Sequence, residues 1–134
     1  MAAIADVEGI GPAYAAKLAE AGVSTTDALL KAGAAKAGRA ALAASTGITQ
    51  TLILEWVNHV DLMRVKGVGS QYSDLLEAAG VDSVPELAQR NAANLAKAMA
   101  DANAAKKLVR QLPSEALVAG WVAHAKTLER VVTH

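Results

Sequence analysis

The chain has 134 residues, 13 Lys and Arg against 13 Asp and Glu, a formal net charge of zero, and no cysteine. The neutral balance argues against strong nonspecific binding to nucleic acid, because dedicated DNA-binding domains are usually basic. The lack of cysteine excludes disulfides and thiolate metal sites. Hydrophobic residues make up 53% of the chain, alanine is the most frequent residue and strand-like alternation is lacking, so we expect an all-α protein.

The first half of the chain reads as short helices separated by glycine. Residues 9–12 (Gly-Ile-Gly-Pro) predict a tight turn and then a helix to about Ala21, because glycine permits positive φ and proline suits the first helical position. Ile10 is expected to anchor this turn in the core. A short helical turn is expected within residues 1–6, and further helices over about residues 26–32, 34–45 and 50–64.

The second half follows the same order. Residues 67–70 (Gly-Val-Gly-Ser) predict a second tight turn, with Ser70 as the N-cap of a helix that runs to about Ala79. Gly22 and Gly80 are expected just past the helices that follow the two turns, where a left-handed residue closes a helix. Further helices are expected over about residues 84–90, 92–102 and 115–131, with Ser83 and Asn91 as caps of the first two.

The two halves repeat each other. The turn glycines recur 58 residues apart, as Gly9 and Gly67 show, and Trp-Val-x-His occurs at residues 56–59 and again at 121–124. Repetition of this kind predicts a tandem duplicated helical domain whose halves pack as one compact body. The predicted units are residues 1–64 and 65–134.

The first turn and its helix resemble the helix-hairpin-helix motif of nucleic-acid-binding proteins, since a small residue, Ala15, and then Lys17 follow the Gly-x-Gly turn. The second copy keeps the turn, but Leu75 replaces the lysine, and Asp74 and Glu77 lie nearby. As a whole, the chain resembles a bacterial family of unknown function built from tandem helix-hairpin-helix units. The motifs that carry this resemblance are Gly-Ile-Gly-Pro-x-Tyr-Ala at 9–15, Thr-Gly-Ile at 46–48, Trp-Val-Asn-His at 56–59, Asp-Leu-Met-Arg at 61–64, Gly-Val-Gly at 67–69 and Glu-Leu-Ala-Gln-Arg at 86–90.

This resemblance implies a fold and a broad role. The implied fold is an all-α bundle similar to SAM and helix-hairpin-helix domains, with two helix-hairpin-helix motifs, and the implied role is interaction with nucleic acid or protein. The family brings no catalytic residue, and the sequence holds neither a P-loop nor a recognisable nucleophile–base arrangement. We therefore expect a noncatalytic module.

Each predicted turn leaves backbone N–H groups at the start of a helix, which is a ready site for an anion such as phosphate. Two alternatives stay open: the turn carbonyls bind a monovalent cation, or the turns are interhelical connections without a ligand. No other cofactor is expected. The candidate nucleic-acid-binding residues are Gly9, Ile10, Gly11 and Lys17 in the first copy and Lys66, Gly67, Val68, Gly69 and Ser70 in the second.

Other conspicuous residues have both a functional and a structural interpretation. Tyr14 and Tyr72 are interpreted as core residues with the hydroxyl at the edge. Each Trp–His pair shares one helix face and is interpreted as packing, because only His134 remains to complete a metal site. Dispersed lysines and arginines form candidate phosphate-contacting strips or, alternatively, solvated faces. The candidate strips are Lys31, Lys36 and Arg39 in the first half and Lys97, Lys106, Lys107 and Arg110 in the second.

Two functions are compatible with these patterns. The turn motif favours a module that grips double-stranded DNA by its phosphates, weakly and without sequence preference, and we rank this function first. The neutral charge favours a protein-interaction module, with a symmetric homodimer as the simplest form. The sequence shows no secretory leader and no apolar run long enough to cross a membrane, so we expect a cytoplasmic protein without a membrane role.

Overall fold

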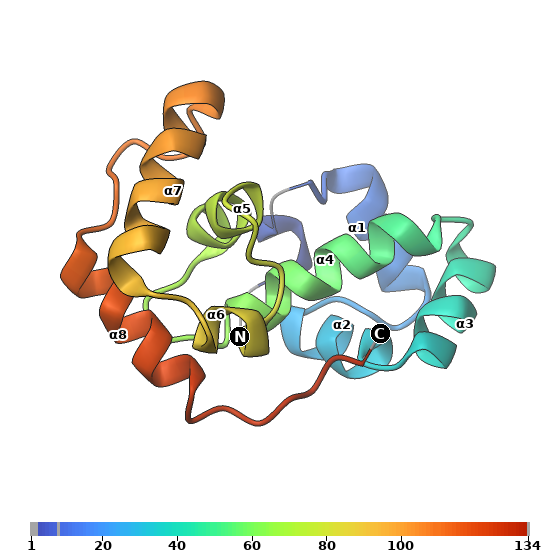
Figure 1. Cartoon of the computed structure of the whole chain (residues 1–134). Coiled ribbons are helices and arrows are strands. Elements are labelled where there is room, and N and C mark those ends of the chain that lie inside the picture. Colours follow the sequence, from blue (N-terminus) through green and yellow to red (C-terminus); the bar gives the residue numbers. More distant parts are fainter. Residues whose placement is uncertain (1–2, 8, 134) are drawn as a thin grey trace. The chain divides into compact units, whose positions relative to one another are not determined.

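The fold is helical throughout. The structure, a computed structural model, describes residues 3–7 and 9–133, and Figure 1 shows short helices joined by turns, which confirms the predicted all-α class. Over these residues, strand-like pairing is confined to an isolated antiparallel bridge between Ala3 and Thr25. None of the helices in these ranges combines the length and the apolar character that a membrane crossing requires.

The helices fall into two compact units. The first unit comprises Met1–Asp61 together with Val131–His134, and the second comprises Leu62–Arg130. The packing of the two halves as one body stays a prediction. Along the described ranges the elements are η1 (Ile4–Asp6), α1 (Pro12–Glu20), α2 (Thr26–Gly33), α3 (Lys36–Thr46), α4 (Gln50–Leu62), α5 (Ser70–Ala78), α6 (Val84–Ala88), α7 (Ala92–Lys106) and α8 (Glu115–Ala125).

In the first unit, α1 packs on η1 and α3, and α2 packs on α3. The wide apolar face of α4 contributes Trp56 and Val57 to the core. Two glycines let the helices approach closely. A Cβ on Gly33 would lie 2.5 Å from Val57 Cγ2, and a Cβ on Gly38 would overlap the Ala32 carbonyl oxygen.

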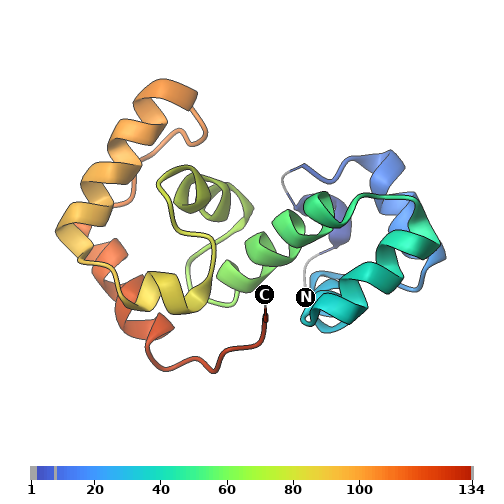
Figure 2. The same cartoon turned by 45° about the vertical axis from the view of Figure 1, so that its right-hand side comes forward.

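In the second unit, α7 packs against α5 and α8, and α6 packs against α8. Figure 2 shows α7 in orange where it meets α8 in red. The glycine inside α8 has no close neighbour, since a Cβ on Gly120 would meet no atom within 4 Å. The core of this unit is built mainly from large apolar side chains, among them Leu75, Leu76, Leu87, Leu95, Met99 and Trp121.

The helix ends follow the local chemistry of the sequence. Gly22 closes α1 with a φ of 86°, and the N–H of the next residue, Val23, donates to the Leu18 carbonyl oxygen at 2.8 Å. Gly80 closes α5 in the same way, with a φ of 97°. Five of the described helices start with a side-chain oxygen that accepts the backbone N–H three residues later. These caps are Thr25 for α2, Thr49 for α4, Ser83 for α6, Asn91 for α7 and Ser114 for α8.

Two predicted helix ends in the second unit are wrong. Gly69, not Ser70, is the N-cap of α5, and Ser70 is the first helical residue. The extended dihedrals of Gly69 (φ −93°, ψ −171°) place it outside the helix. α7 continues past its predicted end near Ala102 to Lys106, and it stops where Lys107 adopts the left-handed conformation, with a φ of 53°.

The last helix is also shorter than predicted. α8 ends at Ala125, whereas the apolar spacing predicted a helix to about Val131. The last described residues of the chain pack in the first unit instead of extending the helix. Val132 is buried in the core of that unit, and the Thr133 N–H donates to the Ala34 carbonyl oxygen at 2.8 Å. The packing of this tail outweighs the helical pattern of its apolar residues.

Arg39 is buried, so the predicted basic strip of the first half is wrong at this residue, whereas Lys31 and Lys36 are exposed. Its Nη1 donates to the carbonyl oxygens of Gly33 and Ala34, at 2.8 and 3.1 Å. Its Nη2 donates to the Thr133 carbonyl oxygen at 2.7 Å. The guanidinium therefore ties the C-terminal end of α2 to the tail, and it does not lie on a solvated face.

Gly38→Ala should destabilise the chain, although alanine is normally the better helix residue by about 1 kcal/mol. The added methyl would overlap the Ala32 carbonyl oxygen, so α2 and α3 would have to move apart. We expect the free energy of unfolding to fall by roughly 1–3 kcal/mol, measured by urea denaturation followed by circular dichroism. Gly120→Ala is the matched control, because its new Cβ would meet no neighbouring atom. Its free energy of unfolding should rise by up to about 1 kcal/mol. Equal effects at the two positions would contradict the close packing of α2 on α3.

Candidate nucleic-acid interface

Each Gly-x-Gly turn is closed by a hydrogen bond and anchored by its middle residue. The Ile10 N–H donates to the Val7 carbonyl oxygen, and the Val68 N–H donates to the Val65 carbonyl oxygen, both at 3.0 Å. The Ile10 side chain is buried, which confirms its predicted role as an anchor, and the Val68 side chain is buried at the corresponding position of the second turn. Because these side chains point into the core, any ligand at the turns would meet the backbone around them.

The first glycine of each turn is required by the fold. Gly9 and Gly67 have φ values of 89° and 91°, in a region that costs other L-residues about 1–2 kcal/mol. A tryptophan indole also lies against each glycine. A Cβ on Gly9 would lie 3.3 Å from Trp56 Nε1, and a Cβ on Gly67 would lie 3.0 Å from Trp121 Nε1.

The second glycine of each turn is not required by the backbone conformation or by the packing of the fold. Gly11 and Gly69 have φ values of −84° and −93°, which any residue adopts, and a Cβ on either would meet no atom within 4 Å. Both are exposed, and both are N-caps that lack a side-chain oxygen to pair with the first N–H groups of the helix. The surface at these two positions is therefore bare backbone.

Backbone donors are available at both turns. At the first turn, the N–H groups of Gly9, Gly11 and Ala13 find no acceptor within the described chain, and Pro12 has no N–H. These groups lie at the positive end of the α1 dipole, so they suit an oxyanion. At the second turn, the donors without an acceptor among the described residues are the N–H groups of Gly67, Gly69 and Gln71.

An aromatic pair supports each turn from behind. The ring centroids of Tyr14 and Trp56 lie 5.1 Å apart, with the ring planes at 59°, and those of Tyr72 and Trp121 lie 5.1 Å apart at 54°. Both tyrosines are half-buried, and the Tyr72 hydroxyl donates to the Gln111 carbonyl oxygen at 3.1 Å. The tyrosines are packing residues with the hydroxyl at the edge, as predicted.

His124 holds the start of the second turn. The Lys66 N–H donates to His124 Nδ1 at 2.9 Å, so this ring nitrogen carries no proton. Beside it, Trp121 Nε1 is buried and has no acceptor in the part of the chain that the structure describes. The sequence predicted that His124 packs with Trp121, but it did not predict the bond to Lys66. The recurrence of Trp-Val-x-His in both halves was the sequence feature that could have indicated a structural role for this histidine.

The two turns differ in the charges around them. Lys17 is exposed in the last turn of α1, whereas the corresponding residue of α5, Leu75, is buried. Lys66 is exposed just before the second turn, but Asp74 and Glu77 on α5 add negative charge there. Acidic residues also accompany the first turn, with Asp6 in η1 and Glu20 at the end of α1, so Lys17 is the charge that distinguishes the first turn from the second.

Every residue of the predicted basic strip of the second half is exposed, whereas the strip of the first half includes the buried Arg39. Its residues lie on α7 and in the segment that follows α7. Exposure is compatible with both a solvated face and a phosphate-contacting face. The strip consists of Lys97, Lys106, Lys107 and Arg110.

These features define an all-helical domain with two backbone turns that are open to solvent. The chain belongs to the family described as Domain of unknown function (DUF4332), whose model matches residues 8–128. No curated protein and no solved structure matches the chain. The family agrees with the predicted family of unknown function, and it assigns neither an activity nor a partner.

Gly67→Ala should destabilise the second unit, because the new Cβ needs a positive φ and lies 3.0 Å from Trp121 Nε1. We expect a loss of about 1–3 kcal/mol in the free energy of unfolding, measured by chemical denaturation. Gly69→Ser is the matched control two residues away. Serine is a favoured N-cap and its side chain enters open space, so stability should change by less than about 0.5 kcal/mol. A Gly67→Ala variant as stable as Gly69→Ser would refute the indole contact.

Proposed function

We propose that the chain is a noncatalytic module of two helix-hairpin-helix units, in tandem, that binds the backbone of double-stranded DNA. Binding is weak, independent of sequence and sensitive to salt. The observation that supports this proposal is the bare backbone at Gly11 and Gly69. A glycine that the fold does not need is explained when a phosphate must approach the backbone N–H groups closely.

At the first hairpin, phosphate oxygens accept hydrogen bonds from the N–H groups of Gly11 and Ala13. Gly9 contributes a further N–H and fixes the shape of the turn. The positive end of the α1 dipole favours the anion, and Lys17 adds a positive charge on the same helix. Contacts of this kind hold a protein on a duplex without reading its sequence.

The second hairpin acts as an auxiliary contact. It offers the N–H groups of Gly67 and Gly69 and the exposed Lys66 side chain. Asp74 and Glu77 reduce its attraction for phosphate, so it contributes less binding free energy than the first hairpin. A monovalent cation at the hairpin carbonyls and a cytoplasmic location both stay predictions.

A protein partner or a second copy of the chain is the alternative function, and one surface feature favours it. Leu112 and Leu117 in the second unit are 43% and 41% exposed, which is high for large apolar residues. With zero net charge, such a surface suits contact with another protein. Under this alternative the hairpins are structural turns.

Fluorescence anisotropy of a labelled random-sequence duplex, titrated at two salt concentrations, tests the proposal. Gly11→Ser should keep the stability of the chain but weaken binding by about tenfold, because the serine hydroxyl covers the helix N–H groups and its side chain fills the approach to them. Lys17→Glu should also weaken binding and lower the slope of log K against log salt by about one. Lys31→Glu is the control, because it makes the same change of charge at an exposed position on α2. It should weaken binding less than Lys17→Glu does.

Binding to DNA that is unchanged in both Gly11→Ser and Lys17→Glu would refute the first hairpin as the phosphate site. Absence of binding by the unmodified chain at low salt would refute the whole proposal. Light scattering of the same sample would then test the alternative, since a concentration-dependent dimer that Leu117→Gln disrupts would indicate self-association through the exposed leucines.

A further inference from the structure

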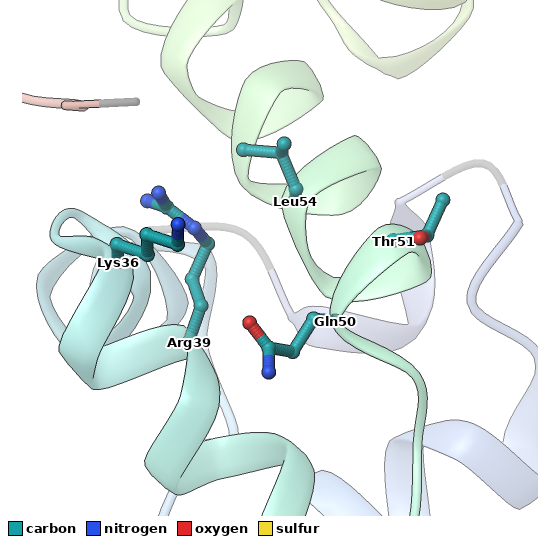
Figure 3. Close-up of a pocket in the computed structure, with 5 residues that line it drawn as sticks. All are labelled: Lys36, Arg39, Gln50, Thr51 and Leu54. Atoms are coloured by element: carbon teal, nitrogen blue, oxygen red, sulfur yellow. The ribbon is translucent and has the colours of Figure 1, made fainter.

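A cavity of about 290 Å³ lies in the first unit between the first turns of α3 and α4. Two basic side chains line it from α3, and three residues line it from α4. Figure 3 shows Lys36 and Arg39 on one side, with Gln50 extending toward them from the start of α4. Thr51 and Leu54 complete the lining, so the residues of this cavity include two cations and no carboxylate.

The charge of Arg39 is buried, and none of the described residues supplies a counter-ion. Its side chain belongs to a residue that is 4% exposed, and its hydrogen bonds go to carbonyl oxygens of Gly33, Ala34 and Thr133. Those bonds use three of its five N–H groups. Within the described residues, no carboxylate pairs with Arg39 or with Lys36. Carbonyl oxygens satisfy the donors without neutralising the charge, and buried charges in proteins are normally paired.

The remaining lining also favours an anion. Lys36 is the exposed first residue of α3, and the N-cap before it, Ala35, has no side-chain oxygen to pair with the first N–H groups of that helix. Gln50 is the first residue of α4 and supplies an amide donor on the side that faces α3. The positive ends of two helix dipoles thus border the same cavity.

From these contacts we propose that the cavity binds a small oxyanion, namely inorganic phosphate or the phosphate group of a small monoester. The anion neutralises Arg39 and Lys36 and accepts a hydrogen bond from Gln50. The volume lies at the lower limit of small-molecule sites, which span roughly 300–1,000 Å³, so the ligand is small. The site does not involve the Gly-x-Gly hairpins, and it does not depend on the proposed DNA binding.

Titration of the full chain with inorganic phosphate, followed by amide NMR at constant ionic strength, tests this site. We expect saturable shifts in the Gln50 side-chain amide and in the backbone amides at the starts of α3 and α4. Lys36→Gln should weaken phosphate binding by about tenfold, because it removes a charge-assisted contact from an exposed position that the core does not need. Lys31→Gln is the matched control, since it removes an equally exposed charge that does not line the cavity.

Gly11→Ser separates this site from the first hairpin and should bind phosphate at the cavity with unchanged affinity. Three results would overturn the proposal: no saturable shifts, shifts centred on Gly11 rather than Gln50, or equal weakening in Lys31→Gln and Lys36→Gln. Competition then identifies the source of the phosphate. Displacement by a DNA duplex indicates a backbone phosphate, and displacement by glycerol phosphate alone indicates a free monoester.

Discussion

Each Gly-x-Gly turn depends on one contact, in which the edge of a tryptophan indole lies against a glycine. Trp56 meets Gly9 and Trp121 meets Gly67, so a side chain at either glycine would crowd the indole nitrogen. The positive φ of these glycines directs the chain into α1 or α5, and a tyrosine on that helix then packs on the same indole. The turn near the start of each unit is thereby fixed by a helix late in that unit. Neither turn has its shape without the core behind it.

Much of this arrangement can be predicted from the sequence because its determinants are local. A capping residue such as Ser83 or Asn91 satisfies an N–H three residues away, and Gly22 ends a helix by its own dihedral angles. The anchoring of the turns by Ile10 also follows from an apolar residue between two glycines. These features need no knowledge of which helix packs against which.

The errors occur where a distant residue decides the outcome. Arg39 resembles a solvated arginine on an alanine-rich helix, yet it donates a hydrogen bond to Thr133, which lies 94 residues away in the sequence. The same tail contact ends α8 early, because Val132 is more stable in a core than on an exposed helical face. At the second turn, Gly69 and Ser70 are both acceptable caps, and the geometry of the turn selects the glycine. The cavity beside Arg39 was not predicted for the same reason, since its lining comes from two separate helix starts.

Net charge is a weak guide to whether such a turn meets phosphate. At an ionic strength of 0.1 M, exposed charges are screened over about 10 Å, so an anion at the first turn responds to Lys17, the α1 dipole and the free N–H groups rather than to the sum over the chain. The two glycines of a turn give more specific information, because they share one helix start but differ in their surroundings. The fold explains Gly9 completely and Gly11 not at all, and the same contrast recurs at Gly67 and Gly69. Under the proposed function, a phosphate that approaches from outside accounts for both bare glycines, because N–H groups at a helix start favour an anion.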